Sequence, residues 1–313
     1  MVDVFARLIP FRFQRITDAA NKVSQRKRSG INRKLLILKN KMIEFYKMSG
    51  SGNDFIIIDN RDLSLNVGDL PAFARRVCER KISVGADGLL LIEPSKTVNF
   101  KWQFFNSDGS MAEMCGNASR CVARYAYLKD IAPKKMSFET LAGIISAEVN
   151  DDIVKVRLTD PSPVQSIGKL VIDDCQFVLD SVDTGVPHAV TFVDNLEACT
   201  VFEWGRKIRR HECFQPRGAN ANFATVIDRH KIRVRTYERG VEDETLACGT
   251  GDVASVLAAA SRGLVETPVD VIVQSGETLR IYFTKKDDRF GEIYLEGKVK
   301  IVYQGLLFEE AYK

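Results

Sequence analysis

Two cysteines stand in closely matching surroundings, and a cysteine thiol can act as an acid, a base or a nucleophile. Cys115 lies in Met-Cys-Gly-Asn and Cys248 in Ala-Cys-Gly-Thr, and apolar residues at helical spacing follow each of them. A cysteine just before a helix lies beside unpaired backbone N–H groups and the positive end of the helix dipole, which stabilise its thiolate. Gly116 and Gly249 would let an anion approach those N–H groups closely.

Two such helix starts facing each other would place the thiols on opposite sides of a carbon atom whose carboxylate lies between them. One thiolate would remove the α-proton from one face, and the other thiol would return a proton to the opposite face. The pair therefore predicts inversion of a stereocentre. Free cysteine is more often a small buried residue. We assign that structural role to the five cysteines without this context: Cys78, Cys121, Cys175, Cys199 and Cys213.

Short β-rich segments dominate the chain after residue 42, and many alternate apolar and polar residues as strands with one buried face do. The predicted helices that matter are the two that follow the paired cysteines. The class is mixed α and β. The predicted strands are Ile56–Ile58, Leu89–Ile92, Lys101–Phe105, Val154–Leu158, Lys231–Tyr237, Val269–Val273, Leu279–Phe283 and Lys298–Tyr303.

The two cysteine segments are introduced in the same way, which predicts an internal duplication. A strand, a polar loop, Cys-Gly and a helix follow one another in each half. The polar residue at the strand end precedes the cysteine by 9 positions in one half (Asn106) and by 10 in the other (Glu238). The Asp160-Pro-Ser-Pro163 segment between them is the expected crossing, because proline interrupts helices and strand ladders.

The charge is distributed unevenly along the 313 residues. Residues 1–41 hold eleven Lys or Arg and two Asp or Glu, a net of +9, whereas the remainder carries a net of −5. The basic segment lacks the apolar region and cleavage site of a secretory signal. It is expected to be an extension before a working start at Met42, an organelle transit peptide, or a basic arm for nucleic acid. No nucleic-acid binding is expected of the acidic body.

Composition excludes several classes of protein. With 45% hydrophobic and 27% charged residues, the chain is typical of a globular protein, and no apolar segment approaches the roughly 20 residues that span a bilayer. Seven cysteines without a secretory signal indicate free thiols in a reducing compartment. No metal is expected, since there is no C-x-x-C and the three histidines have no ligand spacing. The G-x-G-x-x-A of residues 249–254 lacks a supporting βαβ unit, so no nucleotide cofactor is expected either.

An ordered set of motifs resembles the diaminopimelate epimerase family. The resemblance runs from residue 42 to about 305 and leaves residues 1–41 outside it. The motifs are Lys47–Phe55 (KMSGSGNDF), Gly85–Gly88 (GADG), Phe105–Ser110 (FNSDGS), Met114–Asn117 (MCGN), Gly185–His188 (GVPH), Asn220–Phe223 (NANF), Glu238–Gly240 (ERG) and Glu244–Gly251 (ETLACGTG).

The resemblance implies an α+β (α/β) fold of two pseudo-symmetric domains, each a mostly antiparallel sheet wrapped around a central helix, with the active site in the cleft. The expected N-terminal domain is residues 42–158 plus about 300–313, and the expected C-terminal domain is residues 159–299. The last strand, near Val299–Leu307, is expected to pack on the first domain. Residues 1–41 are expected to lie outside the fold.

The same resemblance implies a cofactor-independent epimerase that interconverts LL- and meso-2,6-diaminoheptanedioate in lysine biosynthesis and peptidoglycan precursor synthesis. It implies a cytoplasmic homodimer, Cys115 and Cys248 as the acid/base pair, and His188 and Glu238 as residues that set thiol protonation. Gly116, Asn117, Gly249 and Thr250 would bind the reacting carboxylate. The remaining substrate ligands would be Asn53, Asn106, Asn220, Glu238 and Arg239.

Three positions depart from the commonest family pattern. Val186 replaces a frequent asparagine that helps to bind the distal end of the substrate, Ala118 replaces a frequent glycine, and Glu242-Asp243 lengthens a loop by one residue. Other functions stay open at this point: a related racemase for proline, histidine or another amino acid, a thiol redox protein, or a nucleic-acid binder acting through the basic segment. Asn117, where proline racemases tend to have histidine, argues against proline.

Overall fold

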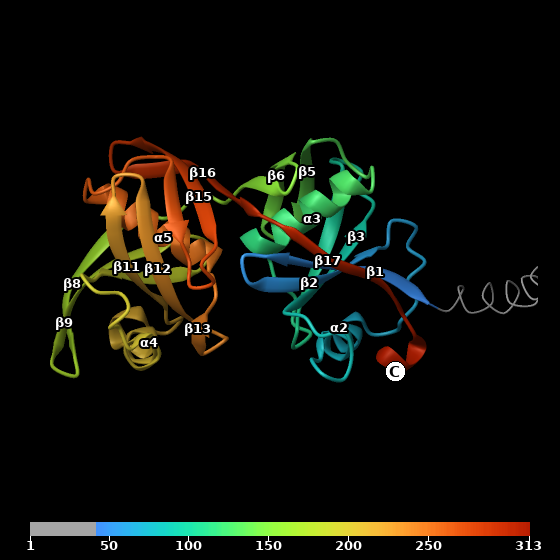
Figure 1. The fold of residues 1–313 in the computed structure, drawn as a ribbon, viewed down its shortest axis with the longest axis horizontal. Helices are drawn as coiled ribbons and strands as arrows, with labels where there is room; N and C mark the ends of the chain where they lie inside the picture. Colours follow the sequence, from blue (N-terminus) through green and yellow to red (C-terminus); the bar gives the residue numbers. More distant parts are fainter. Residues whose placement is uncertain (1–41) are drawn as a thin grey trace, which may run out of the picture.

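Residues 42–313 are described here from a computed structural model, and the basic segment discussed above lies outside these residues. The chain forms two lobes side by side, which continuous β-structure connects (Figure 1). No helix among residues 42–313 is long and apolar enough to cross a membrane.

Eight strands form the first set. In spatial order they run β17–β1–β2–β3–β4–β5–β6–β7, and neighbours are antiparallel except for the parallel pairs β2–β3 and β4–β5. Their bounds are β1 Ile43–Gly50, β2 Asn53–Asp59, β3 Gly88–Glu93, β4 Phe100–Asn106, β5 Lys135–Thr140, β6 Gly143–Asn150, β7 Ile153–Arg157 and β17 Lys300–Leu307.

Eight further strands form the second set, in the order β8–β9–β10–β11–β12–β14–β15–β16, with β10–β11 and β12–β14 as the parallel pairs. The short β13 (Asp243–Thr245) pairs with β12. The bounds are β8 Gln165–Ile172, β9 Cys175–Asp183, β10 Pro187–Phe192, β11 Asn220–Asp228, β12 Lys231–Glu238, β14 Val269–Ile272, β15 Thr278–Lys286 and β16 Arg289–Lys298.

The sequence of parallel and antiparallel pairs is identical in the two sets, which is the structural counterpart of the predicted duplication. Both sets read antiparallel, antiparallel, parallel, antiparallel, parallel, antiparallel, antiparallel. The last members, β7 and β16, pair with each other in antiparallel register. The predicted mixed, mostly antiparallel fold class is therefore confirmed, whereas the exact domain limits stay a prediction.

The predicted strand over Lys298–Tyr303 is confirmed in part: Lys300–Tyr303 lie in β17, but the chain changes from one set to the other at the start of the predicted range. β16 ends at Lys298 and β17 begins at Lys300. Val299 between them is fully buried, and its N–H donates to the carbonyl of Asp152 at 2.8 Å. A residue that leaves one ladder and enters another keeps the hydrophobic pattern of a strand, which is why the sequence pattern does not reveal the break.

Two buried helices occupy the centres of the lobes (Figure 1). α3 (Gly116–Leu128) and α5 (Gly249–Ser261) are the helices predicted after the paired cysteines. α5 is apolar nearly all round and buries ten of its thirteen residues, as a central helix must. α3 buries Cys121, Val122 and Tyr125 but leaves Leu128 exposed at its end.

Two outer helices were not resolved by the sequence pattern: α2 (Leu70–Cys78), which Asp69 caps at its N-terminus, and α4 (Val201–Arg210). They occupy corresponding places, because α2 follows β2 and α4 follows β10. Residues 42–313 also contain two single turns of 3-10 helix, η2 (Glu212–Phe214) and η3 (Glu309–Ala311).

Candidate active site

The topology gathers the predicted polar residues at one edge of each sheet. Asn53 begins β2, Asn106 ends β4, and both strands pair with the start of β3 at Gly88. In the second set, Asn220 begins β11 and Glu238 ends the neighbouring antiparallel strand β12. The chain runs from these edges to the starts of α3 and α5 respectively.

The two helix starts meet at a single buried leucine. Cys115 and Cys248 are the N-cap residues of α3 and α5, both with extended backbone, and neither side chain forms a capping hydrogen bond. A Cβ atom added to Gly116 or to Gly249 would lie 2.9 Å from the same Cδ2 of Leu295 on β16. Since carbon atoms do not approach so closely, a side chain at either position would displace Leu295, and the two helix starts lie side by side.

Burial raises the pKa of both thiols. The backbone N–H groups of Asn117 and Ala118 oppose this effect at Cys115, as expected at a helix N-terminus. Cys248 is 6% exposed, and burial followed by the charge of Glu238 raises its pKa well above the ordinary value. Its Sγ lies 3.5 Å from Oγ1 of Thr250, and that hydrogen bond favours the thiolate. Both thiols are thus held largely protonated at neutral pH.

Glu238 connects the two thiols electrostatically. Burial raises the pKa of its carboxyl group, while hydrogen bonds, one of them with Cys248, lower it. Its negative charge in turn raises the pKa of Cys115 and of Cys248. The residue predicted at the strand end therefore lies where its charge influences both thiols.

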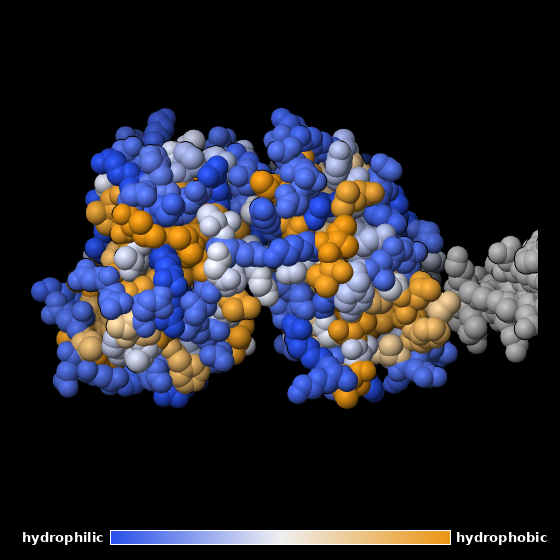
Figure 2. Space-filling view, in the orientation of Figure 1, coloured by the Kyte–Doolittle hydropathy of each residue, from blue (hydrophilic) through white to orange (hydrophobic). Residues whose placement is uncertain are grey.

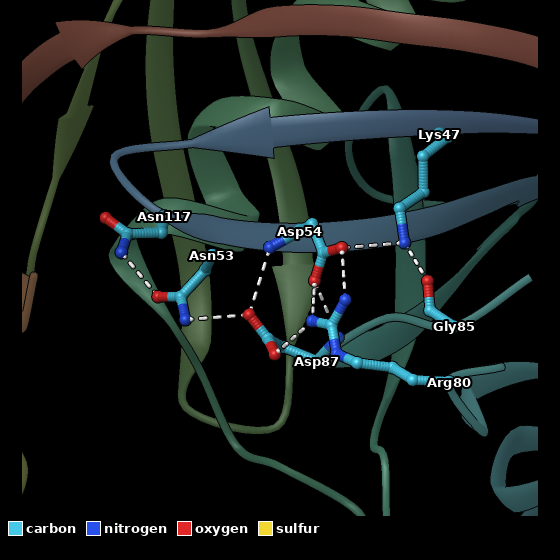
Figure 3. Close-up of polar contacts among 7 residues, drawn as sticks. All are labelled: Lys47, Asn53, Asp54, Arg80, Gly85, Asp87 and Asn117. Atoms are coloured by element: carbon cyan, nitrogen blue, oxygen red, sulfur yellow. Dashed lines mark hydrogen bonds and ion pairs between the residues drawn. The ribbon is translucent and has the colours of Figure 1, made fainter. Parts of the chain in front are cut away.

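Two of the predicted asparagines form one hydrogen-bonded chain. Nδ2 of Asn117 donates to Oδ1 of Asn53 at 2.7 Å, and Nδ2 of Asn53 donates to Oδ2 of Asp87 at 3.0 Å (Figure 3). Asn106 is not part of this chain, because its Nδ2 donates to Oγ of Ser110 within its own loop at 3.0 Å. The structure thus brings Asn53 to the start of α3 and leaves Asn106 on the rim.

The corresponding loop of the second set joins Asn220 to Arg239. Oδ1 of Asn220 accepts from the backbone N–H of Arg239 at 2.7 Å. The guanidinium of Arg239 donates to the carbonyl of Arg217 at 3.0 Å. Arg239 therefore has a partly buried side chain with donors left over for a carboxylate.

His188 is fully buried in β10, and burial lowers its pKa to about 3. Its Nδ1 lies 3.2 Å from Nδ2 of Asn222, which also donates to the carbonyl of Ala189 at 2.9 Å. Because Nδ2 of an asparagine is a donor, Nδ1 accepts and the imidazole is neutral. No described hydrogen bond connects His188 to either thiol, so its predicted effect on thiol protonation stays a prediction.

Two buried charges behind the helix starts have no counterpart in the predicted site. Arg120 is fully buried in α3, and its positive charge lowers the pKa of Cys115. Asp252 is 1% exposed in α5, and its charge raises the pKa of Cys248. The available sequence signal was a charged residue among the small and apolar residues of each predicted helix, because charged residues are rarely fully buried without a role.

The three departures from the family pattern lie in defined places. Ala118 is fully buried in α3. Val186 is partly buried, and its carbonyl accepts from the N–H of Thr184, whose hydroxyl donates to the carbonyl of Thr250 at 3.2 Å. Glu242 of the lengthened loop accepts from Nε of Arg209 at 3.0 Å. Ala118 and Val186 are thus the departures that lie at or beside a helix start.

Other concave regions do not coincide with the thiols. A hollow of about 980 Å³ is lined by residues at the start of β1 and the end of α3, among them Asp59 and Tyr125, and contains none of the predicted site residues. Within residues 42–313, no group of three or more His, Cys, Asp or Glu side chains is arranged to hold a metal ion. The position of the site therefore rests on the two helix starts.

Solved structures share this fold at low sequence identity. A PhzF-family phenazine biosynthesis protein from Bacillus anthracis is 16% identical with a TM-score of 0.67, over 86% of this chain and 99% of that one. A hydroxyproline epimerase from Agrobacterium vitis is 16% identical with a TM-score of 0.64, over 87% and 93%. The duplicated sheet is therefore the fold that this chain shares with these two structures.

Sequence comparison identifies the family within this fold. A family model described as diaminopimelate epimerase matches residues 45–164 and 181–302. Curated relatives named diaminopimelate epimerase include those of Aquifex aeolicus, 48% identical over 86% of this chain and 99% of the relative, and of Archaeoglobus fulgidus, 41% identical over 85% and 96%. This chain belongs to the diaminopimelate epimerase family.

Proposed function

We propose that this chain interconverts LL- and meso-2,6-diaminoheptanedioate by proton transfer between two thiols. The observation that carries the proposal is the meeting of the Cys115 and Cys248 helix starts at Leu295, with Glu238 acting on both. The family membership supports the same substrate.

In the proposed reaction, the N–H groups at the two helix starts, from Gly116 and Asn117 and from Gly249 and Thr250, bind the reacting carboxylate. One cysteine acts as thiolate and removes the α-proton, so the C–H electron pair passes into the carboxylate and gives an enediolate. The oriented N–H groups stabilise this developing charge. The other thiol donates its proton to the opposite face of the same carbon, and the configuration is inverted.

The distal end of the substrate carries a second ammonium and a second carboxylate. Arg239 and Asn220, which are joined by a 2.7 Å hydrogen bond, are proposed to bind this end with Asn106 on the rim. Val186 offers no side-chain polar group where many relatives have asparagine, so one distal hydrogen bond is replaced by apolar contact. We expect the enzyme to tolerate changes at the distal amine better than at the distal carboxylate.

The proposed setting is lysine biosynthesis and peptidoglycan precursor synthesis in the cytoplasm, by a homodimer. Support for self-association comes from β17, which among residues 42–313 pairs with β1 alone. Ile301, Val302 and Tyr303 of this strand are 40%, 55% and 44% exposed. Figure 2 shows hydrophobic surface on the lobe that β17 crosses. A monomer mass from light scattering at micromolar concentration would contradict the dimer.

The test is turnover of LL-diaminopimelate, beside a panel of other amino acids, with a reductant present. We expect Cys115→Ala and Cys248→Ala each to abolish epimerisation and to abolish solvent deuterium incorporation in the epimerised product. Cys121→Ala is the matched control, because this buried cysteine lies on the same helix as Cys115 but in the core. Full activity of either active-site variant, or turnover of another amino acid alone, would refute the proposal.

A further inference from the structure

A hydrogen-bonded chain of two asparagines ends in a residue that can only donate and a residue that can only accept. Nη2 of the fully buried Arg120 donates to Oδ1 of Asn117 at 2.8 Å. The chain continues through Asn53 to Oδ2 of Asp87, as described above (Figure 3). It therefore runs from the core of α3 to the loop before β3 without a break.

The two ends decide which way each amide points. A guanidinium has N–H donors and no acceptor, whereas a carboxylate has acceptors and no donor. If either asparagine were rotated by 180°, an N–H would face an N–H or an oxygen would face an oxygen. An asparagine by itself has no such preference, since its oxygen and nitrogen ends have the same shape.

The acceptor end is itself held by charged neighbours. Arg80 donates to Oδ1 of Asp87 at 2.9 Å and to Oδ1 of Asp54 at 2.6 Å, and the backbone N–H of Asp54 donates to Oδ2 of Asp87 at 3.1 Å. Lys47 lies 2.8 Å from Asp54 and is 5% exposed. Both oxygens of the Asp87 carboxylate therefore accept hydrogen bonds, one of them from an arginine, and these bonds fix its orientation.

The fixed orientation leaves donors for a ligand. Both carbonyl oxygens are used within the chain, and each Nδ2 uses one of its two N–H groups there. No other hydrogen bond of either Nδ2 occurs among residues 42–313. The asparagine nearer the surface, Asn53, is partly buried and thus has one N–H to offer and no oxygen.

We infer that Arg120 and Asp87 are positioning residues that make the wall beside Cys115 a donor-only surface, suited to a carboxylate and unsuited to an ammonium group. This inference rests on the proposed function for the identity of the ligand, a zwitterion with both groups at its reacting end. An asparagine free to rotate would accept from the ammonium as readily as it donates to the carboxylate. The fixed polarity selects one binding orientation.

The first test replaces Asp87 by asparagine, which keeps the shape but removes the obligate acceptor. Arg80 then competes with Asn53 for the single amide oxygen at position 87. We expect Asp87→Asn to raise KM for LL-diaminopimelate at least tenfold while kcat stays within threefold, because a contact common to ground and transition states is weakened. Asp59→Asn is the matched control, since Asp59 at the end of β2 also accepts from an arginine, Arg61, at 2.8 Å but lies outside the site.

The second test uses the donor end. Arg120→Lys keeps a pure donor and is expected to keep KM within threefold, whereas Arg120→Gln offers either an oxygen or an N–H and is expected to raise KM as Asp87→Asn does. A KM unchanged in Asp87→Asn, or equal KM values in the two Arg120 variants, would overturn the inference. Thermal midpoints measured for every variant separate this effect from loss of folding.

The amide orientation is measured separately from activity, by nitrogen-15 NMR of the side-chain amides. In the wild-type protein, one proton of each Asn53 and Asn117 amide is expected to exchange slowly, and Asp87→Asn is expected to abolish this protection at Asn53. Slow exchange without turnover of diaminopimelate would refute the proposed function and leave the fixed polarity standing. Fast exchange of both amides in an active enzyme would overturn the inference alone.

Discussion

Replacing Glu238 by glutamine tests the electrostatics of the site without requiring a substrate. The carboxylate charge raises the pKa of both thiols, and Glu238 is also hydrogen-bonded to Cys248. Glutamine removes the charge at nearly constant shape. The pKa of both thiols is therefore expected to fall, and that of Cys248 is expected to fall further.

The size of the effect follows from the hydrogen bond between Glu238 and Cys248. Two unit charges at about 4 Å interact by about 4 kcal/mol at an effective dielectric constant of about 20, equivalent to about three pKa units. Glu238 is partly exposed, so solvent screens part of this interaction. We expect a decrease of roughly one to two pKa units at Cys248 and less than one at Cys115.

The assay is alkylation by iodoacetamide as a function of pH, read separately for the two cysteine peptides by mass spectrometry. Only the thiolate reacts, so the midpoint of each rate profile gives the pKa of one thiol. Asp270→Asn is the control. Its carboxylate lies 2.7 Å from Nε of Arg280, and this pair is not at the helix starts. A pKa of Cys248 that is unchanged or higher in Glu238→Gln, or a larger decrease at Cys115, would refute the reasoning.

Three further predictions follow from the same contacts. The profile of kcat/KM against pH should be bell-shaped, because the proposed mechanism needs one thiolate and one thiol. Its acid limb should lie above about 8.5, the value for free cysteine. An acid limb below pH 7 would contradict the raised pKa of the thiols. His188 should show constant imidazole chemical shifts from pH 8 to 5, since its pKa is about 3. Because the unfolded chain binds this proton near pH 6.5, the free energy of unfolding should fall as pH falls below that value. A titration midpoint near 6.5 for His188 in the folded protein would contradict the lowering of its pKa by burial. Gly249→Ala should cost about 1–3 kcal/mol of folding stability, because the added methyl group overpacks against Leu295. Adding Leu295→Val should restore much of the lost thermal midpoint. An unchanged midpoint in Gly249→Ala would show that the helix start can shift.

The sequence could predict the parts of the site that depend on neighbours along the chain. The helix starts at Cys115 and Cys248 follow from local spacing and capping, and the duplication follows from comparing two such segments. Glu238 was found in the same way, because it ends a strand ten residues before its cysteine. The motif resemblance then supplied the substrate.

The remaining features depend on pairings between distant segments. Asp87 and Arg80 enter the site only because β2 and β3 run parallel, which a local hydrophobic pattern does not specify. The break at Val299 was missed for the same reason. Arg120 can be recognised in the sequence as a charged residue in an apolar helix. Its role in orienting Asn117 follows only from the tertiary structure, which places Asn53 and Asp87 next in the same hydrogen-bonded chain.

The position of β17 at the end of the sequence determines when the first set of strands can be completed during synthesis. β17 occupies, in the first set of strands, the place that β8 occupies in the second, although it is the last strand of the chain. During translation, β1 would therefore emerge from the ribosome with one edge unpaired and keep it until nearly the whole chain had followed. The first set of strands is thus synthesised first but completed last. Removing only residues 300–313 is therefore expected to leave β1 as an unpaired edge that promotes aggregation, while the second set keeps all its strands.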